Sequence, residues 1–277
     1  TFSGVGISGA AGTSYTLTFA SGALTPATQA ITPTAGAATR VALNGGDGQS
    51  APAGTAVSTA PSVLVRDVNS NPVSGVSVTF AVATGGGSAS DGAATTNGSG
   101  IAVVGRWTLG TTAGANTLTA TSGGLTGSPV TFTATGTAGA ASAATSTVSR
   151  APASLTANGS ATSILTVRLK DANGNSLTAS SGSVTFAAPT LGGIASVTDI
   201  GDGTWTAVYT AGTTAGVETI APVLDGTPFT NTTTVTLTAG AATQVALSGG
   251  DGQSATAGTA VTTPPAVIVR DVNGNPV

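Results

Sequence analysis

Apolar residues alternate with Thr, Ser or charged residues along most of the chain, which is the two-residue period of β-strands with one buried face. In the first part of the chain this pattern predicts strands over residues 62–68, 76–82, 116–122 and 129–135. Gly, Pro, Asn and Asp cluster between these segments, as they do in turns. No window shows a helical period, and the abundant Gly and β-branched residues disfavour helices. The sequence therefore predicts an all-β protein.

The same pattern returns along the chain with a period of about one hundred residues, which indicates a repeat architecture. The string TAGAAT at 34–39 recurs as TAGAAS at 137–142 and as TAGAAT at 238–243. Residues 40–57 and 244–261 are nearly identical, whereas the sequence after the middle copy differs. Two types of repeat therefore alternate.

These boundaries predict four segments. About seven short strands in about 100 residues is the strand count of a β-sandwich. Residues 35–137 and 138–238 are expected to form complete domains of two types, residues 1–34 the C-terminal part of a domain, and residues 239–277 an N-terminal part. The two end pieces together are shorter than one repeat, which argues against their completing each other. We therefore expect the chain to be a segment of a longer polypeptide of alternating repeats.

Several motifs carry a resemblance to a known family. The stretches VRDVNSNPVSGVSVTF (65–80) and ATTNGSGIAVVGRWTLGTTAGANTLTAT (94–121) resemble the bacterial Ig-like repeats of the invasin and intimin type. The stretch GDGTWTAVYTAGTTAGVETI (201–220) is similar to the same superfamily, with a filamin-like hairpin. The resemblance implies tandem Ig-like β-sandwich domains in an extended string, located outside the cell or on a bacterial surface.

Composition restricts the chemistry further. Charged residues make up 6% of the chain, and Cys, His and Met are absent, whereas a soluble domain has about 25% charged residues. Without Cys or His the chain offers no thiolate nucleophile, imidazole base or zinc site. Seven scattered basic residues form no stripe for nucleic acid, and no apolar run approaches the roughly 20 residues of a spanning helix. We predict no enzymatic activity, no catalytic or cofactor-binding residues, no nucleic-acid partner and no membrane insertion within this segment.

The string DVNSN raises the question of a metal site, because Asp67, Asn69 and Asn71 occupy the first, third and fifth positions of a calcium-loop pattern. The sixth position is Pro72 rather than Gly, and the twelfth is Val78 rather than Glu. Asp and Asn also cap their own turns. The pattern favours a turn with a local Asp cap and predicts no metal or cofactor, with weak calcium binding as the alternative.

Other candidates also fit a scaffold better than a site. The Gly-rich string GGDGQS at 45–50 opens no helix and therefore predicts a loop rather than a phosphate cradle. Asp199 and Asp202 precede a strand as in a hairpin turn. Lys170 is considered for an internal isopeptide bond, but the first repeat has no Lys. Glycan sequons begin at Asn97, Asn158 and Asn231, and the aromatic residues expected in the core or at corners are Trp107, Trp205, Tyr15 and Tyr209.

Together these features predict a non-enzymatic structural or adhesive repeat region that forms a stiff stalk or fibre. The alternatives are a subunit of a laterally packed extracellular filament or sheath, and a module that binds a host protein or glycan. The expected partners are neighbouring Ig-like domains of the same chain, copies of the chain in a filament, and a surface receptor or glycan.

Overall fold

The computed structural model describes residues 3–277, and the chain divides into two compact units, Thr1–Thr137 and Ala138–Val277. The described residues contain strands, bridges and turns and no helix. The first unit comprises β1 (Tyr15–Phe19), β2 (Ala27–Ile31), β3 (Ala38–Gly45), β4 (Gln49–Pro52), β5 (Ser62–Asp67), β6 (Ser77–Thr84), β7 (Ser88–Ser90), β8 (Ala93–Thr95), β9 (Ile101–Val103), β10 (Arg106–Thr108), β11 (Gly114–Thr121) and β12 (Val130–Thr137).

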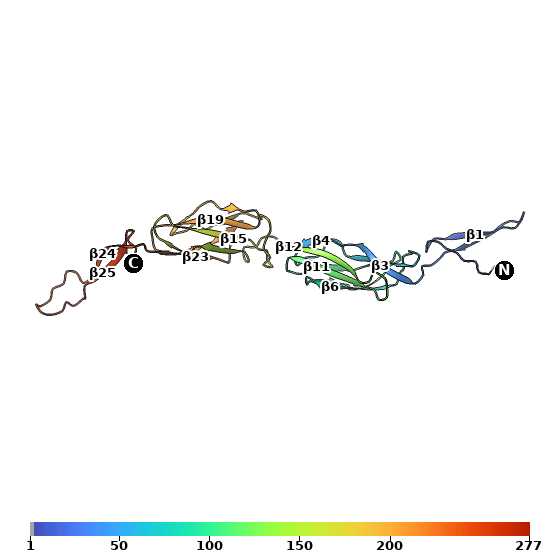
Figure 1. The fold of residues 1–277 in the computed structure, drawn as a ribbon, viewed down its shortest axis with the longest axis horizontal. Helices are drawn as coiled ribbons and strands as arrows, with labels where there is room; N and C mark the ends of the chain where they lie inside the picture. The colour runs from blue at the N-terminus through green and yellow to red at the C-terminus, as the bar shows by residue number, and fades with distance from the viewer. Residues whose placement is uncertain (1–2) are drawn as a thin grey trace. The chain divides into compact units, whose positions relative to one another are not determined.

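The first complete repeat, residues 35–137, is a two-layer β-sandwich (Figure 1). One layer has the strand order β4-β12-β11-β6-β8, the other has the order β3-β5-β9, and β10 pairs with β7 in a separate two-stranded sheet. All of these pairings are antiparallel except β12 with β4. The sandwich confirms the all-β Ig-like prediction for this part of the chain.

The alternation of buried and exposed residues explains how these strands form two layers. Along β12 every second residue is buried, beginning with Val130 and Phe132, while the intervening Thr residues are exposed. Val63 and Val65 of β5 face them from the other sheet and are fully buried. Each strand therefore presents one apolar face to a shared core, and burial of that face stabilises the fold.

The second unit comprises β13 (Thr147–Ala151), β14 (Ser154–Thr156), β15 (Thr162–Arg168), β16 (Val184–Phe186), β17 (Gly192–Ile194), β18 (Thr198–Asp199), β19 (Thr204–Ala211), β20 (Gly216–Ile220), β21 (Pro222–Leu224), β22 (Thr227–Pro228), β23 (Thr233–Thr238), β24 (Ala242–Gly249) and β25 (Ala266–Asp271). One sheet has the order β13-β15-β19-β17, with β18 also paired to β19. The others are β14-β23-β20, β16-β21-β22 and the two-stranded sheet β24-β25. The first three sheets, with strands from Thr147 to Thr238, form the second repeat.

The aromatic residues differ in their burial from one repeat to the other. Trp107 on β10 is fully buried in the core of the first repeat. In the second repeat the fully buried aromatic residue is Tyr209, whereas Trp205 remains partly exposed beside a smaller apolar cluster. Trp205, which the sequence places in the core or at a corner, packs against this cluster, so Tyr209 rather than Trp205 is the fully buried aromatic residue of the repeat. Tyr15 on β1 accepts the N–H of Ala10 through its hydroxyl.

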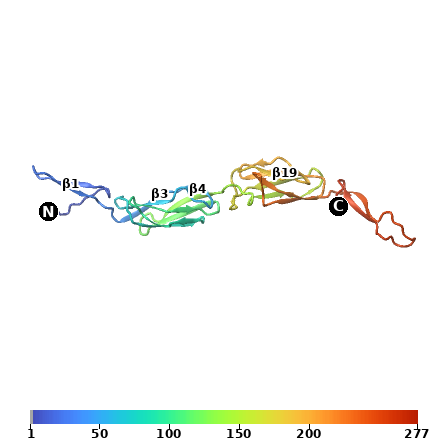
Figure 2. The same ribbon diagram turned by 180° about the vertical axis from the view of Figure 1, so that it is seen from behind.

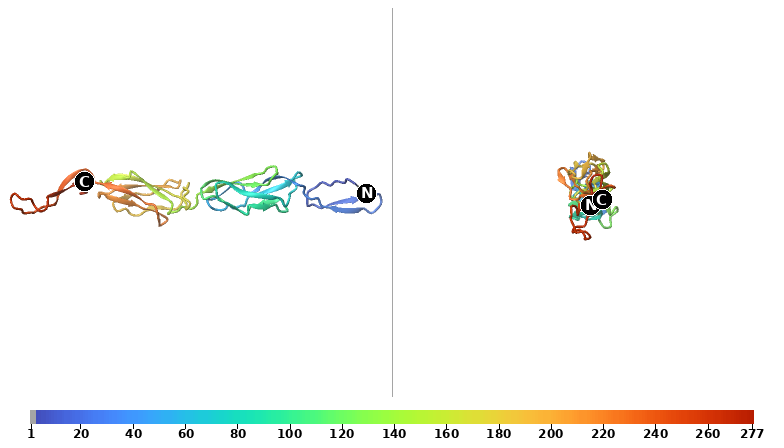
Figure 3. Two further views of the ribbon diagram at one scale, coloured as in Figure 1. Left: turned by 90° about the horizontal axis from the view of Figure 1, so that it is seen from below. Right: turned by 90° about the vertical axis from the view of Figure 1, so that its left-hand side faces the viewer.

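The two end segments form hairpins rather than sandwiches. Strands β1 and β2 pair antiparallel and precede the first sandwich in its unit (Figure 2). Strands β24 and β25 pair antiparallel and follow the second sandwich in its unit (Figure 3). Some of their large apolar side chains are exposed, such as Leu247 at 65%, whereas Leu17 and Ile268 are half-buried.

Candidate functional site

The Asp67 turn is held by its own carboxylate. Oδ1 of Asp67 accepts the backbone N–H groups of Asn69 and Asn71 at 2.9 and 2.8 Å. Oδ2 accepts the side-chain amide of Asn71 at 3.0 Å and the backbone N–H of Gly36 at 2.9 Å. Ser70 adopts a left-handed φ of 73°, a conformation that few non-glycine residues adopt. Four N–H donors therefore surround a carboxylate that is only 1% exposed.

The other two copies of the motif repeat this geometry. Asp171 accepts the N–H groups of Asn173, Asn175 and Gly139 and the side-chain amide of Asn175, all at 2.9 Å. Asp271 accepts the corresponding four bonds from Asn273, Asn275 and Gly240. Gly174 and Gly274 take the left-handed position of Ser70, with φ of 85° and 86°. The two repeat types therefore share one turn, although their other sequences differ.

Hydrogen bonding keeps these carboxylates ionised. The side-chain amide of Asn275, with the N–H groups of Gly240, Asn275 and Asn273, lowers the pKa of Asp271 to about 2, against the opposing effect of burial. Burial alone would raise the pKa of Asp171, but its N–H donors outweigh burial and lower the pKa. N–H donors favour the charged form of a carboxylate because they stabilise the negative charge. Each Asp thus stays charged at pH values where an ordinary Asp is protonated.

The sequence suggested that the carboxylate caps its own turn. The carboxylate also binds a residue outside that turn. Gly36, Gly139 and Gly240 lie in the three TAGAA strings, and each donates its N–H to an Asp 31 or 32 residues later. The Asp therefore fastens the link that leads into its repeat to the turn. Sequence reasoning missed this contact, although the constant spacing between the Gly and the Asp was a detectable signal.

The geometry of the turn leads to a prediction about calcium. We expect thermal unfolding of the chain in EDTA and in millimolar calcium to give the same midpoint, because a cation would have to displace four N–H donors from each carboxylate. Differential scanning calorimetry measures both midpoints directly. A control with magnesium separates specific binding from ionic strength. A midpoint several degrees higher in calcium alone would contradict the turn interpretation.

The Gly-rich string at 45–50 also forms a structural loop. Asp47 accepts the N–H and hydroxyl of Thr133 on β12 at 2.7 and 2.9 Å, and these bonds lower its pKa. The side chain of Gln49 bridges the loop to Thr59 by donating to its carbonyl and accepting its N–H. Polar side chains therefore tie the loop to the sandwich and leave none directed toward a phosphate.

The remaining polar candidates lie in separate turns. Asp199 accepts the N–H of Gly201, and Asp202 accepts that of Thr204, so each carboxylate caps a local turn. The Thr204 hydroxyl and N–H lower the pKa of Asp202, with a smaller contribution from Arg168. Lys170 forms an isolated β-bridge with Ser176. The sequon residues Asn97, Asn158 and Asn231 use their side chains to hold neighbouring backbone groups.

Glu218 is a buried group that sequence reasoning did not single out. It is 4% exposed on β20, and Oε2 accepts the N–H groups of Thr190, at 2.8 Å, and of Leu191. Glu218 lies on the same buried face of the strand as Ile220. This alternation was the signal in the sequence that could have identified Glu218 as buried. Its hydrogen bonds hold the loop between β16 and β17.

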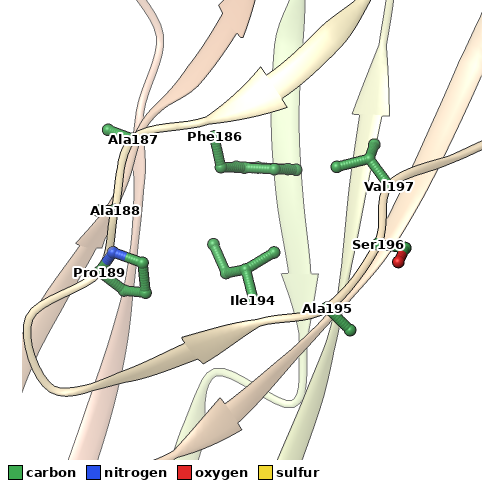
Figure 4. Close-up of a pocket in the computed structure, with 8 residues that line it drawn as sticks. All are labelled: Phe186, Ala187, Ala188, Pro189, Ile194, Ala195, Ser196 and Val197. Atoms are coloured by element: carbon green, nitrogen blue, oxygen red, sulfur yellow. The ribbon is translucent and has the colours of Figure 1, made fainter.

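That loop borders a hollow of about 430 Å³ in the second repeat (Figure 4). Phe186 and Ile194 point toward one another across it, with Pro189 and Val197 at its sides. Phe186, Ile194 and Val197 pack against the apolar core below. Ser196 is the one residue of the lining with a polar side chain. The lining offers apolar contact and the hydroxyl of Ser196, with no acidic or basic side chain in the lining that could activate it.

Residues 3–277 contain no group of three or more acidic, His or Cys side chains placed to hold a metal ion. No helix in this range has the length and hydropathy required to cross a membrane.

Comparisons with known proteins agree with this fold. The family model for invasin domain 3 matches residues 142–240. The Escherichia coli adhesin FdeC is 28% identical over 88% of this chain and 77% of its own solved chain, with a TM-score of 0.50. Invasin, a bacterial integrin-binding protein, is 27% identical over 86% of this chain, with a TM-score of 0.44, and this chain spans 47% of its length.

A third solved structure, InvD of Yersinia pseudotuberculosis, is 24% identical over 82% of this chain and 69% of its own, with a TM-score of 0.45. The comparison with curated protein sequences gave no match. The family match, the all-β sandwiches and the likeness to FdeC agree with the motifs read from the sequence. Residues 142–240 match the family of invasin domain 3, and the chain is similar in sequence and fold to the adhesin FdeC.

Proposed function

We propose that this chain is a non-enzymatic spacer region of a bacterial surface adhesin, which holds a receptor-binding part away from the cell. The observation that carries the proposal is the joint between repeats in the second unit. Strand β23 ends at Thr238 and β24 begins at Ala242. The N–H of Gly240, in the middle of this short link, is held by the carboxylate of Asp271.

A link of three residues with a fixed hydrogen bond has little freedom to bend. Flexible linkers are longer and rich in Gly and Ser with a solvated backbone. Repeats joined in this way make the length of the protein proportional to the number of repeats. This property suits a stalk, whose task is to set a distance.

The surface of the repeats supports the same role. The whole chain has only 17 formally charged residues, 7 basic and 10 acidic. Binding sites on proteins are usually centred on Trp, Tyr or Arg, and the two Trp residues and Tyr209 are buried or partly buried in the repeats. The receptor of the whole protein, a host protein or glycan, is then bound by another part of it.

The proposal is tested by exchanging the repeats in the surface protein that carries them. Replacing 35–238 with two unrelated Ig-like domains should leave adhesion of the cells intact, because the exchange preserves the length of the spacer and the proposed function requires only that length. Deleting 35–238 should reduce adhesion, and the purified chain should not compete with adherent cells. If the exchange abolishes adhesion and the purified chain competes, the repeats themselves bind the receptor. Electron microscopy of the native material distinguishes single stalks from laterally packed filaments.

A further inference from the structure

The last Asn of the Asp-Asn turn contacts the preceding segment of its unit. Asn275 is 7% exposed, and its side-chain Oδ1 accepts the backbone N–H of Ala215 at 2.8 Å. Its Nδ2 donates to the carbonyl of Thr213 at 2.9 Å and to Oδ2 of Asp271 at 2.9 Å. One carboxamide therefore joins the turn at the start of one repeat to the loop between β19 and β20 of the repeat before it.

A second side chain of the turn reinforces this contact. Nδ2 of Asn273 donates to the carbonyl of Ala157 at 2.9 Å. Ala157 follows β14, so the turn holds two loops at the end of the second repeat. The donors and acceptors on those loops are all backbone groups. The contact therefore depends on the backbone conformation of these loops and should tolerate substitutions of their side chains.

The first unit contains the equivalent contact between its own Asn and a backbone N–H of the preceding segment. Oδ1 of Asn71 accepts the backbone N–H of Ala11 at 3.1 Å, while its Nδ2 donates to Asp67. Ala11 and Ala215 each stand directly before a Gly, Gly12 and Gly216. The interaction therefore occurs in both units with equivalent partners.

The chemistry of this position selects Asn. The side chain must donate to the Asp carboxylate and accept from the Ala N–H at the same time, and a carboxamide provides both groups. Asp would lack the donor and would place a second negative charge beside the first. Ala would leave the N–H of Ala215 and the carbonyl of Thr213 without these partners, which is unfavourable for partly buried groups.

We propose that the last Asn of the turn, Asn71 in the first unit and Asn275 in the second, recognises the preceding segment of its own unit through the backbone N–H of an Ala-Gly pair, and that this contact fixes the joint. The turn is then an interaction surface whose partner is the end of another repeat of this family. The inference deepens the proposed spacer function by naming the contact that makes the joint stiff.

Amide hydrogen exchange of the complete chain, measured by NMR, tests the proposal. Asn275→Ala should accelerate exchange at Ala215 about tenfold, as expected for the loss of one hydrogen bond. Asn71→Ala should have the same effect at Ala11. Val272→Ala is the matched control, because Val272 lies in the same turn with its side chain 71% exposed, and it should leave Ala215 unchanged. Unaltered exchange at Ala215 with Gly240 still protected would overturn the proposal.

The amide of Gly240 shows whether the turn itself survives, since Asp271 holds it. If Gly240 loses protection in Asn275→Ala, the decision rests on Asn71→Ala, for which the amide of Gly36 reports on the Asp67 turn in the same way. Unaltered exchange at Ala11 in that variant would contradict the proposal. Asn273→Ala is a further control, because it removes the bond to Ala157 and leaves Asn275 in place, so Ala215 should stay protected. These exchange rates report on the joint alone. The joint proposal can therefore be wrong while the adhesion experiment supports the spacer function, and the spacer function can be wrong while the exchange rates support the joint proposal.

Discussion

Replacing Trp107 with Ala is expected to lower the free energy of unfolding of the first complete repeat by about 3–5 kcal/mol, the usual cost of removing a large buried aromatic side chain. Trp107 is fully buried, and its cluster includes Val65 from one sheet and Phe132 from the other. Small Val, Ala and Thr residues dominate both sheets, so few neighbours can move in to fill the space. The indole therefore holds the two layers together.

Urea unfolding followed by circular dichroism measures this change. The substitution also leaves Trp205 as the one tryptophan of the chain, so fluorescence then reports on the second unit alone and should be unaltered. Val103→Ala is the control within the same repeat, because Val103 is 45% exposed, and it should change stability by about 0.5 kcal/mol or less. Similar losses for Trp107→Ala and Val103→Ala would show that the core is placed wrongly.

In the second repeat the largest loss is expected from Tyr209→Ala, about 3–5 kcal/mol, and a smaller loss from Trp205→Ala. This order follows burial, because Tyr209 is fully buried in its cluster and Trp205 is partly exposed. It reverses the order that residue size alone suggests. The same urea experiment, followed by circular dichroism, gives both values.

Tyr209→Phe separates the ring of Tyr209 from its hydroxyl. Among the described residues the buried hydroxyl has no hydrogen-bond partner, and burial raises its pKa, with a smaller contribution from Glu218. Removing an unpaired buried hydroxyl costs little or stabilises, so Tyr209→Phe should match or exceed the native stability. A large loss on this substitution, or a larger loss for Trp205→Ala than for Tyr209→Ala, would contradict the assignment of the core.

Much of the fold follows from local pattern. The predicted strand over residues 62–68 corresponds to β5, and that over 116–122 to β11, because period-two alternation with Thr on the outer face has no stable alternative to a sheet. The sequence also predicts that the Asp-Asn motif forms a turn, since Asp and Asn bind their own backbone. Neither required knowledge of distant partners.

The contacts of the Asp-Asn turns with other segments could not be predicted from the sequence. The bonds from Asp67 to Gly36 and from Asn275 to Ala215 join residues 31 and 60 positions apart. Alternation assigns a residue to the inner or outer face of its strand, but it does not say which loop of a neighbouring repeat lies against a turn. The partial burial of Trp205 was inaccessible for the same reason, because Trp205 is in phase with the buried Ala207 and Tyr209 on β19 and alternation alone does not distinguish it from them.

Two nearly identical segments separate what the sequence determined from what tertiary structure decided. Residues 40–43 and 244–247 both form a strand that pairs with a second strand, Val41 opposite Val65 and Val245 opposite Val269. The local sequence is sufficient for this hairpin register, because alternation and turn residues repeat in both copies. Burial differs, however: Val41 is 3% exposed and Val245 is 69% exposed.

The difference arises from the rest of the repeat. In the first copy β11 and β12 supply a second apolar layer, and β12 also pairs with Gln49–Pro52 to make β4. The equivalent residues 253–256 form no strand, since the described residues after Thr238 include no strand that corresponds to β12. A strand edge needs a partner for its backbone hydrogen bonds, and an apolar face needs a second layer to exclude water. The sequence alone therefore determined the strands and turns that it encodes locally, whereas burial, the formation of β4 and the joint contacts were decided by segments distant in the chain.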